Sequence, residues 1–87
     1  MAQYLIESPH TKEECLRALD EIVESDPKLL ERYEFGCMAG DHRGWVVVEA
    51  QNEREAKGYV PLFLRPKSSV VPLNKFTPAQ VRSFHSG

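Results

Sequence analysis

Residues 45–50 constrain the fold most strongly, because their side chains alternate in character as a β-strand requires. One face of this strand is uniformly small and apolar, and consists of Val46, Val48 and Ala50. The opposite face carries Trp45, Val47 and Glu49. This pattern predicts a sheet with one face covered by helices and the other left bare.

Further elements flank this strand. Three more strands are expected at residues 3–8, 33–39 and 68–73. Capping-box patterns predict helices over residues 11–26 and 52–64, the second kinked at Pro61. A short terminal helix from Thr77 is expected to dock through Val81 and Phe84. The order β-α-β-β-α-β predicts an α+β, ferredoxin-like fold whose antiparallel sheet has strand order 4-1-3-2.

Size and composition limit the class of protein. The 87 residues form one domain, residues 1–87, and 41% apolar with 28% charged residues is typical of a globular protein. A net charge of −2 and a pI near 5.9 give no general attraction to nucleic acid or anionic membranes. We expect no membrane span, no signal peptide and, with two cysteines, no disulfide framework, which favours a cytoplasmic location.

The face without helices predicts self-association. Its apolar residues are Leu5, Met38, Trp45 and Val47. A patch of this kind is expected to be covered, and a second copy packed sheet to sheet is the simplest cover. We therefore expect a homodimer, in which Trp45, Met38 and Val47 pack at the interface or line a cleft that binds a small molecule.

Carboxylates on the same face are the first candidates for chemistry. A loop over residues 40–43 would pair Phe35 with Val48 and place Glu34 opposite Glu49. Glu7 is expected nearby on the adjacent strand, about 4.8 Å away. Like charges at that spacing raise each other's pKa or recruit a cation, with His10 as a nitrogen ligand, unless they line a solvated rim.

Cysteine and histidine residues give a weaker signal. Cys37, Asp41 and His42 resemble a metal or nucleophile set, but one Cys-x4-His spacing is no zinc signature without a second pair. Cys37 is expected to pack in the apolar layer, and Cys15 on its helix. His10 and His42 are expected at places too far apart to hold one ion within a subunit.

A family resemblance follows from two motifs. The strand ending Val46-Val47-Val48-Glu49-Ala50 and the helix start Asn52-Glu53-Arg54-Glu55-Ala56 resemble the dimeric α+β barrel superfamily, which includes muconolactone isomerases and small monooxygenases. The first strand with Ser8-Pro9-His10 is also similar to a small nickel-responsive subgroup. The resemblance implies a homodimer with a cleft between its sheets.

Three hypotheses about function remain open. The leading one is a small-molecule binding protein that works as a cofactor-independent isomerase or oxygenase, with Glu49 and Glu7 as acid/base residues and His10 assisting. Its ligand would contact Glu34, Trp45, Met38 and Val47, and we assign it neither a metal nor another cofactor. The alternatives are a metal-binding or metal-responsive protein that uses His10 and carboxylates, and a non-catalytic interaction subunit.

Overall fold

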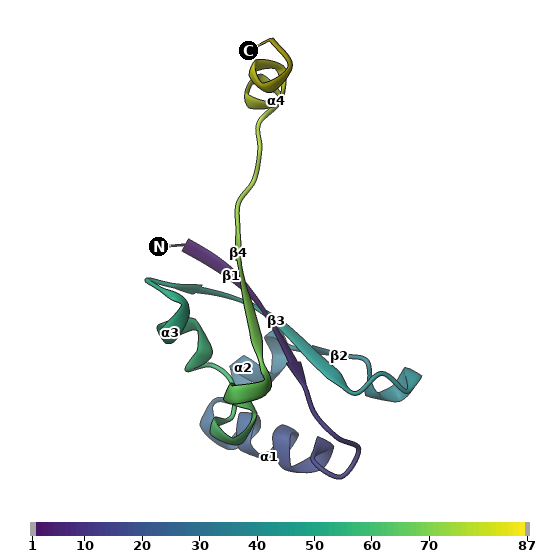
Figure 1. Ribbon diagram of the computed structural model, residues 1–87. Helices are drawn as coiled ribbons and strands as arrows, with labels where there is room; N and C mark the ends of the chain where they lie inside the picture. The colour runs from purple at the N-terminus through teal and green to yellow at the C-terminus, as the bar shows by residue number, and fades with distance from the viewer. Residues whose placement is uncertain (1, 87) are drawn as a thin grey trace.

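The computed structural model describes residues 2–86 and shows an α+β subunit built on an open, four-stranded antiparallel sheet (Figure 1). The strands are β1 (Ala2–Pro9), β2 (Glu34–Phe35), β3 (Arg43–Ala50) and β4 (Ser69–Leu73). Their order is β2-β3-β1-β4, which confirms the predicted arrangement. The helices are α1 (Cys15–Ser25), α2 (Pro27–Arg32), α3 (Glu53–Lys57) and α4 (Pro78–Ser86), with 3₁₀ helices η1 (Cys37–Ala39) and η2 (Leu62–Lys67).

The core lies between one face of the sheet and the first three α-helices. Alternate residues of β1 and β3 are buried there, as the sequence pattern predicts. They pack with residues from α1, α2, α3 and the segment up to η2; the fully buried side chains include Ile6, Val46, Val48, Val60 and Leu64. The other face carries Leu5, Trp45 and Val47, so the partition of the two faces is confirmed for β1 and β3, whereas Met38, expected on the same face, lies on η1.

The register of the second strand differs from the prediction. The chain leaves the sheet after Phe35, which pairs with Gly44, and Glu34 pairs with Trp45 rather than with Glu49. Of the predicted strand over residues 33–39, only Glu34–Phe35 is a strand, and Cys37–Ala39 form the 3₁₀ helix η1.

Two glycines explain why this segment turns. The carbonyl of Gly36 accepts hydrogen bonds from the amides of Ala39 and Asp41, both at 3.0 Å. A Cβ at Gly36 would lie 2.8 Å from the carbonyl oxygen of Asp41, so only glycine fits this close approach. Gly40 ends η1 with a φ of 88°, the left-handed conformation that glycine adopts without strain. Backbone hydrogen bonds within the turn thus replace the predicted ladder.

The direction of pairing between β1 and β3 separates the predicted carboxylates. Because the two strands are antiparallel, the end of β1 lies beside the start of β3. Glu7 pairs with Trp45, and Glu49 pairs with Gln3 at the opposite end. The expectation that Glu7, Glu34 and Glu49 lie at one end of the sheet is wrong for Glu49.

The second predicted helix is shorter than expected. Asn52 caps α3 as predicted, through a 2.8 Å hydrogen bond from the amide of Glu55 to its Oδ1 atom. The helix ends at Lys57, and a separate 3₁₀ turn follows Pro61, because proline lacks the amide that would continue the ladder.

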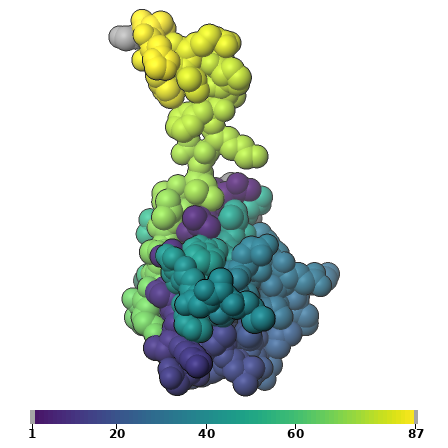
Figure 2. Space-filling view, turned by 90° about the vertical axis from the view of Figure 1, so that its right-hand side faces the viewer, coloured from purple at the N-terminus to yellow at the C-terminus, as the bar shows by residue number. Residues whose placement is uncertain are grey.

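The C-terminal segment projects away from the body of the subunit (Figure 2). Thr77 and Gln80 form the predicted capping pair of α4, with hydrogen bonds of 2.8 and 3.1 Å. Val81 and Phe84 are exposed, so the expected docking of α4 within the subunit is wrong. The projection also explains a radius of gyration of 15.6 Å, because a globular chain of this length has a value of about 12 Å.

No helix within residues 2–86 combines the length and the apolar character that crossing a bilayer requires.

The core predicts a clear contrast between two substitutions. Ile6→Ala should lower the free energy of unfolding by about 2–5 kcal/mol, because it opens a cavity in the fully buried layer. Leu16→Ala on α1 should change it by less than about 0.5 kcal/mol, since Leu16 is 68% exposed. Urea unfolding of both variants measures this, and equal losses would contradict the assigned face of the sheet.

Candidate metal centre

Pairing between β1 and β3 brings two histidines together. The last pair of the ladder is Pro9 with Arg43, and the next residues outward are His10 and His42. The amide of His10 donates a 3.0 Å hydrogen bond to the carbonyl of His42. Their rings meet edge to face, with centroids 5.9 Å apart. The expectation that these histidines cannot share an ion is therefore wrong, because the antiparallel register places both at the same end of the sheet.

Cys15 reaches this place from the first residue of α1. The preceding turn is held by a reciprocal capping pair, in which the Thr11 amide donates to Glu14 Oε1 at 2.8 Å and the Glu14 amide donates to Thr11 Oγ1 at 3.2 Å. Lys67 Nζ also donates to Glu14 Oε1, at 2.7 Å. The start of α1 is thereby anchored to η2, which fixes the position of the Cys15 thiol.

Cys37 comes from η1, the turn that replaces the predicted strand. Its Sγ atom lies 3.4 Å from the Sγ atom of Cys15 and 3.1 Å from Nε2 of His10. The expectation that Cys37 packs in an apolar layer is wrong, because the early end of β2 turns this residue toward β1 and α1.

The four side chains form a compact set of ligand atoms. One atom each from His10, Cys15, Cys37 and His42 lies within 4.8 Å of all the others. In tetrahedral zinc sites with Zn–S bonds near 2.3 Å, sulfur atoms are separated by about 3.8 Å. The 3.4 Å between the two thiols is close to that spacing. Two sulfur and two nitrogen atoms are a donor set that tetrahedral metal sites use.

The four side chains of this cluster are at least half-buried, and they include a buried polar atom without a hydrogen-bond partner among the described residues. His10 is buried, and the three other members are half-buried. Nδ1 of His42 is a buried polar atom without a hydrogen-bond partner among the described residues. A buried polar atom of this kind costs free energy unless a partner satisfies it. A cation bound at this nitrogen would satisfy it.

The surroundings of the Cys37 thiol change its pKa. Burial raises its pKa, and the hydrogen bond from the Cys15 thiol raises it further. This raised pKa favours the protonated thiol in the metal-free protein. Since metals bind the thiolate, metal binding at this site would release the Cys37 proton.

The spacing of the ligands was readable from the chain. His10 and Cys15 form a His-x4-Cys pair, and Cys37 and His42 form a Cys-x4-His pair. The chain therefore contains the two pairs that a zinc motif needs. Their order is reversed, His before Cys in the first pair and Cys before His in the second, and the rest of α1 and all of α2 lie between the two pairs. The sequence analysis did not predict this site, because it considered the pair Cys37 and His42 without the pair His10 and Cys15.

The predicted carboxylates do not contribute ligand atoms to this set. Glu7 Oε1 accepts hydrogen bonds from Arg43 Nη1 at 3.0 Å and from the Trp45 indole at 3.1 Å. Glu34 and Glu49 are exposed. Arg43 also binds Asp41 through its Nε atom at 2.7 Å, and this contact holds the pKa of Asp41 below its ordinary value. The acid/base roles of Glu49, Glu7 and His10 stay predictions.

The predicted ligand-binding residues lie mostly around one hollow. A cavity of about 430 Å³ on the bare face of the sheet is lined by Leu5, Arg32, Glu34, Trp45, Val46 and Val47. Met38 lies outside this lining and is fully exposed on η1. The structure therefore groups Glu34, Trp45 and Val47, as expected, without Met38.

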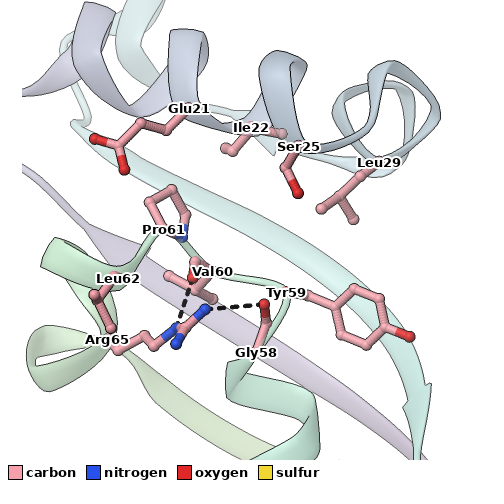
Figure 3. Close-up of a pocket in the computed structure, with 10 residues that line it drawn as sticks. All are labelled: Glu21, Ile22, Ser25, Leu29, Gly58, Tyr59, Val60, Pro61, Leu62 and Arg65. Carbon is pink, nitrogen blue, oxygen red and sulfur yellow. Dashed lines mark hydrogen bonds between the residues drawn. The ribbon is translucent and has the colours of Figure 1, made fainter.

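A second hollow lies on the helical side of the subunit, between α1, α2 and residues 58–65 (Figure 3). Its volume is about 180 Å³. The guanidinium of Arg65 is its main charged donor, and it already binds the carbonyls of Val60 at 2.9 Å and Gly58 at 3.2 Å (Figure 3). These bonds hold the backbone that precedes η2, so Arg65 acts within the fold.

Comparisons with known proteins add no assignment. A scan against protein-family models and searches of curated proteins and solved structures gave no match for this chain.

The anchor beside Cys15 predicts a pH dependence of stability. The hydrogen bond from Lys67 and that from the Thr11 amide lower the pKa of Glu14 from 4.5 to about 2. A carboxylate with a depressed folded-state pKa stabilises the fold above its unfolded pKa and loses this effect as the pH falls toward the folded value. Glu14→Gln should therefore destabilise the protein at neutral pH, and its difference from wild type should shrink as the pH falls from 4.5 to about 2.

The control for this measurement is Glu13→Gln, which removes a charge from the exposed neighbouring position. Urea unfolding in the presence of a chelator would follow both variants across the acidic range. A constant difference between Glu14→Gln and wild type at every pH would contradict the role of the Glu14 carboxylate.

Proposed function

We propose that this protein binds one transition-metal ion, with zinc as the best match, through His10, Cys15, Cys37 and His42. The observation that carries the proposal is the convergence of these four ligand atoms to within 4.8 Å from separate segments of the chain. The buried, unpartnered Nδ1 of His42 supports it independently.

The ligand set favours a borderline or soft cation. Thiolate and imidazole ligands suit zinc, nickel, copper or cobalt, whereas magnesium and calcium prefer oxygen ligands. The nearby carboxylates of Glu7 and Asp41 are bound to Arg43. The metal-binding hypothesis from the sequence is therefore favoured, with thiolates in place of the expected carboxylates.

A site with four protein ligands favours a structural role for the metal over a catalytic role. Catalytic zinc sites usually keep one coordination position open for water or substrate, while structural sites are closed by four side chains. A metal here would connect four places in the chain: the end of β1, the start of α1, η1 and the start of β3. A chain of 87 residues has a small core, and a metal crosslink adds stability that such a core lacks.

We also propose that the subunit belongs to the ferredoxin-like group and specifically to the dimeric α+β barrels. The order of elements, the strand order β2-β3-β1-β4 and the bare face of the sheet support this assignment. The shortness of β2 and α3 departs from the regular pattern, and both departures lie where glycine or proline turns the chain.

Metal binding can be tested with untagged protein. Elemental analysis should find about one zinc per chain, and Co²⁺ should give the intense visible bands of a tetrahedral site together with thiolate charge-transfer absorption. Cys37→Ser should weaken zinc binding by more than about 100-fold, beyond the 10–100-fold typical of changes to the outer hydrogen-bond partners of a metal site.

The matched control is His85→Ala, which removes an exposed histidine of α4 and should leave binding unchanged. His42→Ala and Cys15→Ser should each abolish the tetrahedral Co²⁺ spectrum. Wild-type protein that binds neither ion under reducing conditions would refute the proposed function, as would equal affinities for Cys37→Ser and His85→Ala.

Removal of the metal should lower thermal stability. A ligand at a thousandfold excess over its Kd stabilises the folded state by about 4 kcal/mol, which corresponds to about 15–30 °C for a domain of this size. A chelator should therefore shift the Tm of zinc-loaded wild type by that order and shift the Tm of Cys37→Ser much less, because the variant binds zinc more weakly. Calorimetry would show this, and an unchanged Tm of the wild type would argue against a metal crosslink.

A further inference from the structure

Among the described residues, the C-terminal arm, residues 74–86, contributes no side chain to the core. Every residue of the arm is exposed, including the apolar side chains of Phe76, Val81 and Phe84. The two phenylalanine rings meet edge to face with centroids 5.6 Å apart, so they form one exposed aromatic pair. α4 has 9 residues, and isolated helices shorter than about 12–15 residues are marginal in water. This helix therefore needs a packing partner.

The bare face of the sheet is a second uncovered apolar surface. Leu5 and Trp45 are half-buried on it, and Val47, Val71 and Leu73 are exposed. The cavity of about 430 Å³ lies on this face beside Trp45 and Val47. It is large enough to take an aromatic side chain.

The arm is basic, whereas the rest of the chain is acidic. Lys75 and Arg82 lie on the arm, which has no acidic residue, so the arm carries +2 with its histidine neutral. The whole chain carries −2, so the remainder of the chain carries −4. The carboxylates of Glu34 and Glu49 are exposed on β2 and β3 at the bare face, where Arg32 and Arg43 also lie, and Arg43 is bound to Glu7. The two basic residues of the arm can thus pair with Glu34 and Glu49 of a second copy.

We propose that the arm of each subunit docks on the bare sheet face of a second copy of this chain. The arm continues the direction of β4 away from the sheet, so its course leads it off its own subunit (Figure 1). In a two-fold symmetric pair, each copy supplies one arm and one face, so both uncovered surfaces are buried together. This proposal is independent of the metal centre, because none of the four metal ligands lies on the bare face or the arm.

The single tryptophan of the chain lies on the proposed docking face and gives a direct readout. In wild-type protein, sedimentation should show dimers at tens of micromolar, and Trp45 emission should shift to the red on dilution as the arm leaves. The double variant Phe76→Asp/Phe84→Asp should be monomeric, with red-shifted emission at all concentrations. The control Leu62→Asp, at an exposed apolar position of η2, should remain dimeric.

A complementation experiment tests the contributions of the arm and of the bare face to the dimer separately. One chain ends at Leu73 and keeps the face; its core is intact, because the buried core contains no residue of the arm. The other is the full chain with Val47→Lys, which keeps the arm and disrupts the face. Each should be monomeric alone, and their mixture should form a heterodimer with one docked arm. Zinc is held constant, and Co²⁺ binding by each chain confirms that the metal centre is unaffected.

Three results would overturn the proposal. Wild type that stays monomeric with solvent-exposed Trp45 would show that the arm does not dock. Buried Trp45 emission that is independent of concentration and lost on truncation would show docking within one subunit. Dimers that survive removal of the arm would show that the two sheet faces pack directly on each other, without the arm between the copies.

Discussion

The antiparallel pairing of β1 with β3 is the interaction on which the other features of this molecule depend. Its register, from Ala2 with Ala50 to Pro9 with Arg43, turns one set of alternate side chains toward the helices and the other set toward the bare face. The same register continues through the hydrogen bond from the His10 amide to the His42 carbonyl. A shift by one residue would exchange the two faces of a strand and separate the two imidazoles. Core, bare face and candidate metal site therefore depend on the same ladder.

The candidate metal site consists of side chains from four separate segments of the chain, which only the tertiary fold brings together. His10 and His42 extend the ladder, Cys15 begins a helix anchored by Glu14 and Lys67, and Cys37 lies on a 3₁₀ turn. A cation at this place would close a loop of chain that includes α1 and α2. That arrangement would give a bound metal a structural role at the end of the sheet where β2 contributes only two residues of pairing.

The rest of the chain divides into a body with a complete core and an arm with none. The body buries its apolar residues between the helices and one face of the sheet, and it leaves the other face to the solvent. The arm exposes all of its apolar side chains. For a chain of this size, two uncovered apolar surfaces are consistent with the association between copies that we propose. The cleft expected for a small molecule and the surface proposed for the arm occupy the same face, so association would also decide what can reach Trp45.

The sequence by itself determined the features that depend on neighbouring residues. Alternation identified the core strand β3 and its buried face, and the capping pairs at Thr11, Asn52 and Thr77 fixed where helical turns begin, because such pairs join residues three positions apart. The strand order also followed, since the succession of elements allows few arrangements. Only the tertiary structure decided the register, because hydrogen bonds between distant segments set it. Gly36 and Gly40 turned the chain out of the predicted ladder, which separated Glu34 from Glu49 and brought Cys37 to His10. The two spaced pairs of histidine and cysteine were visible in the chain, but only antiparallel pairing of β1 with β3 could show that they meet.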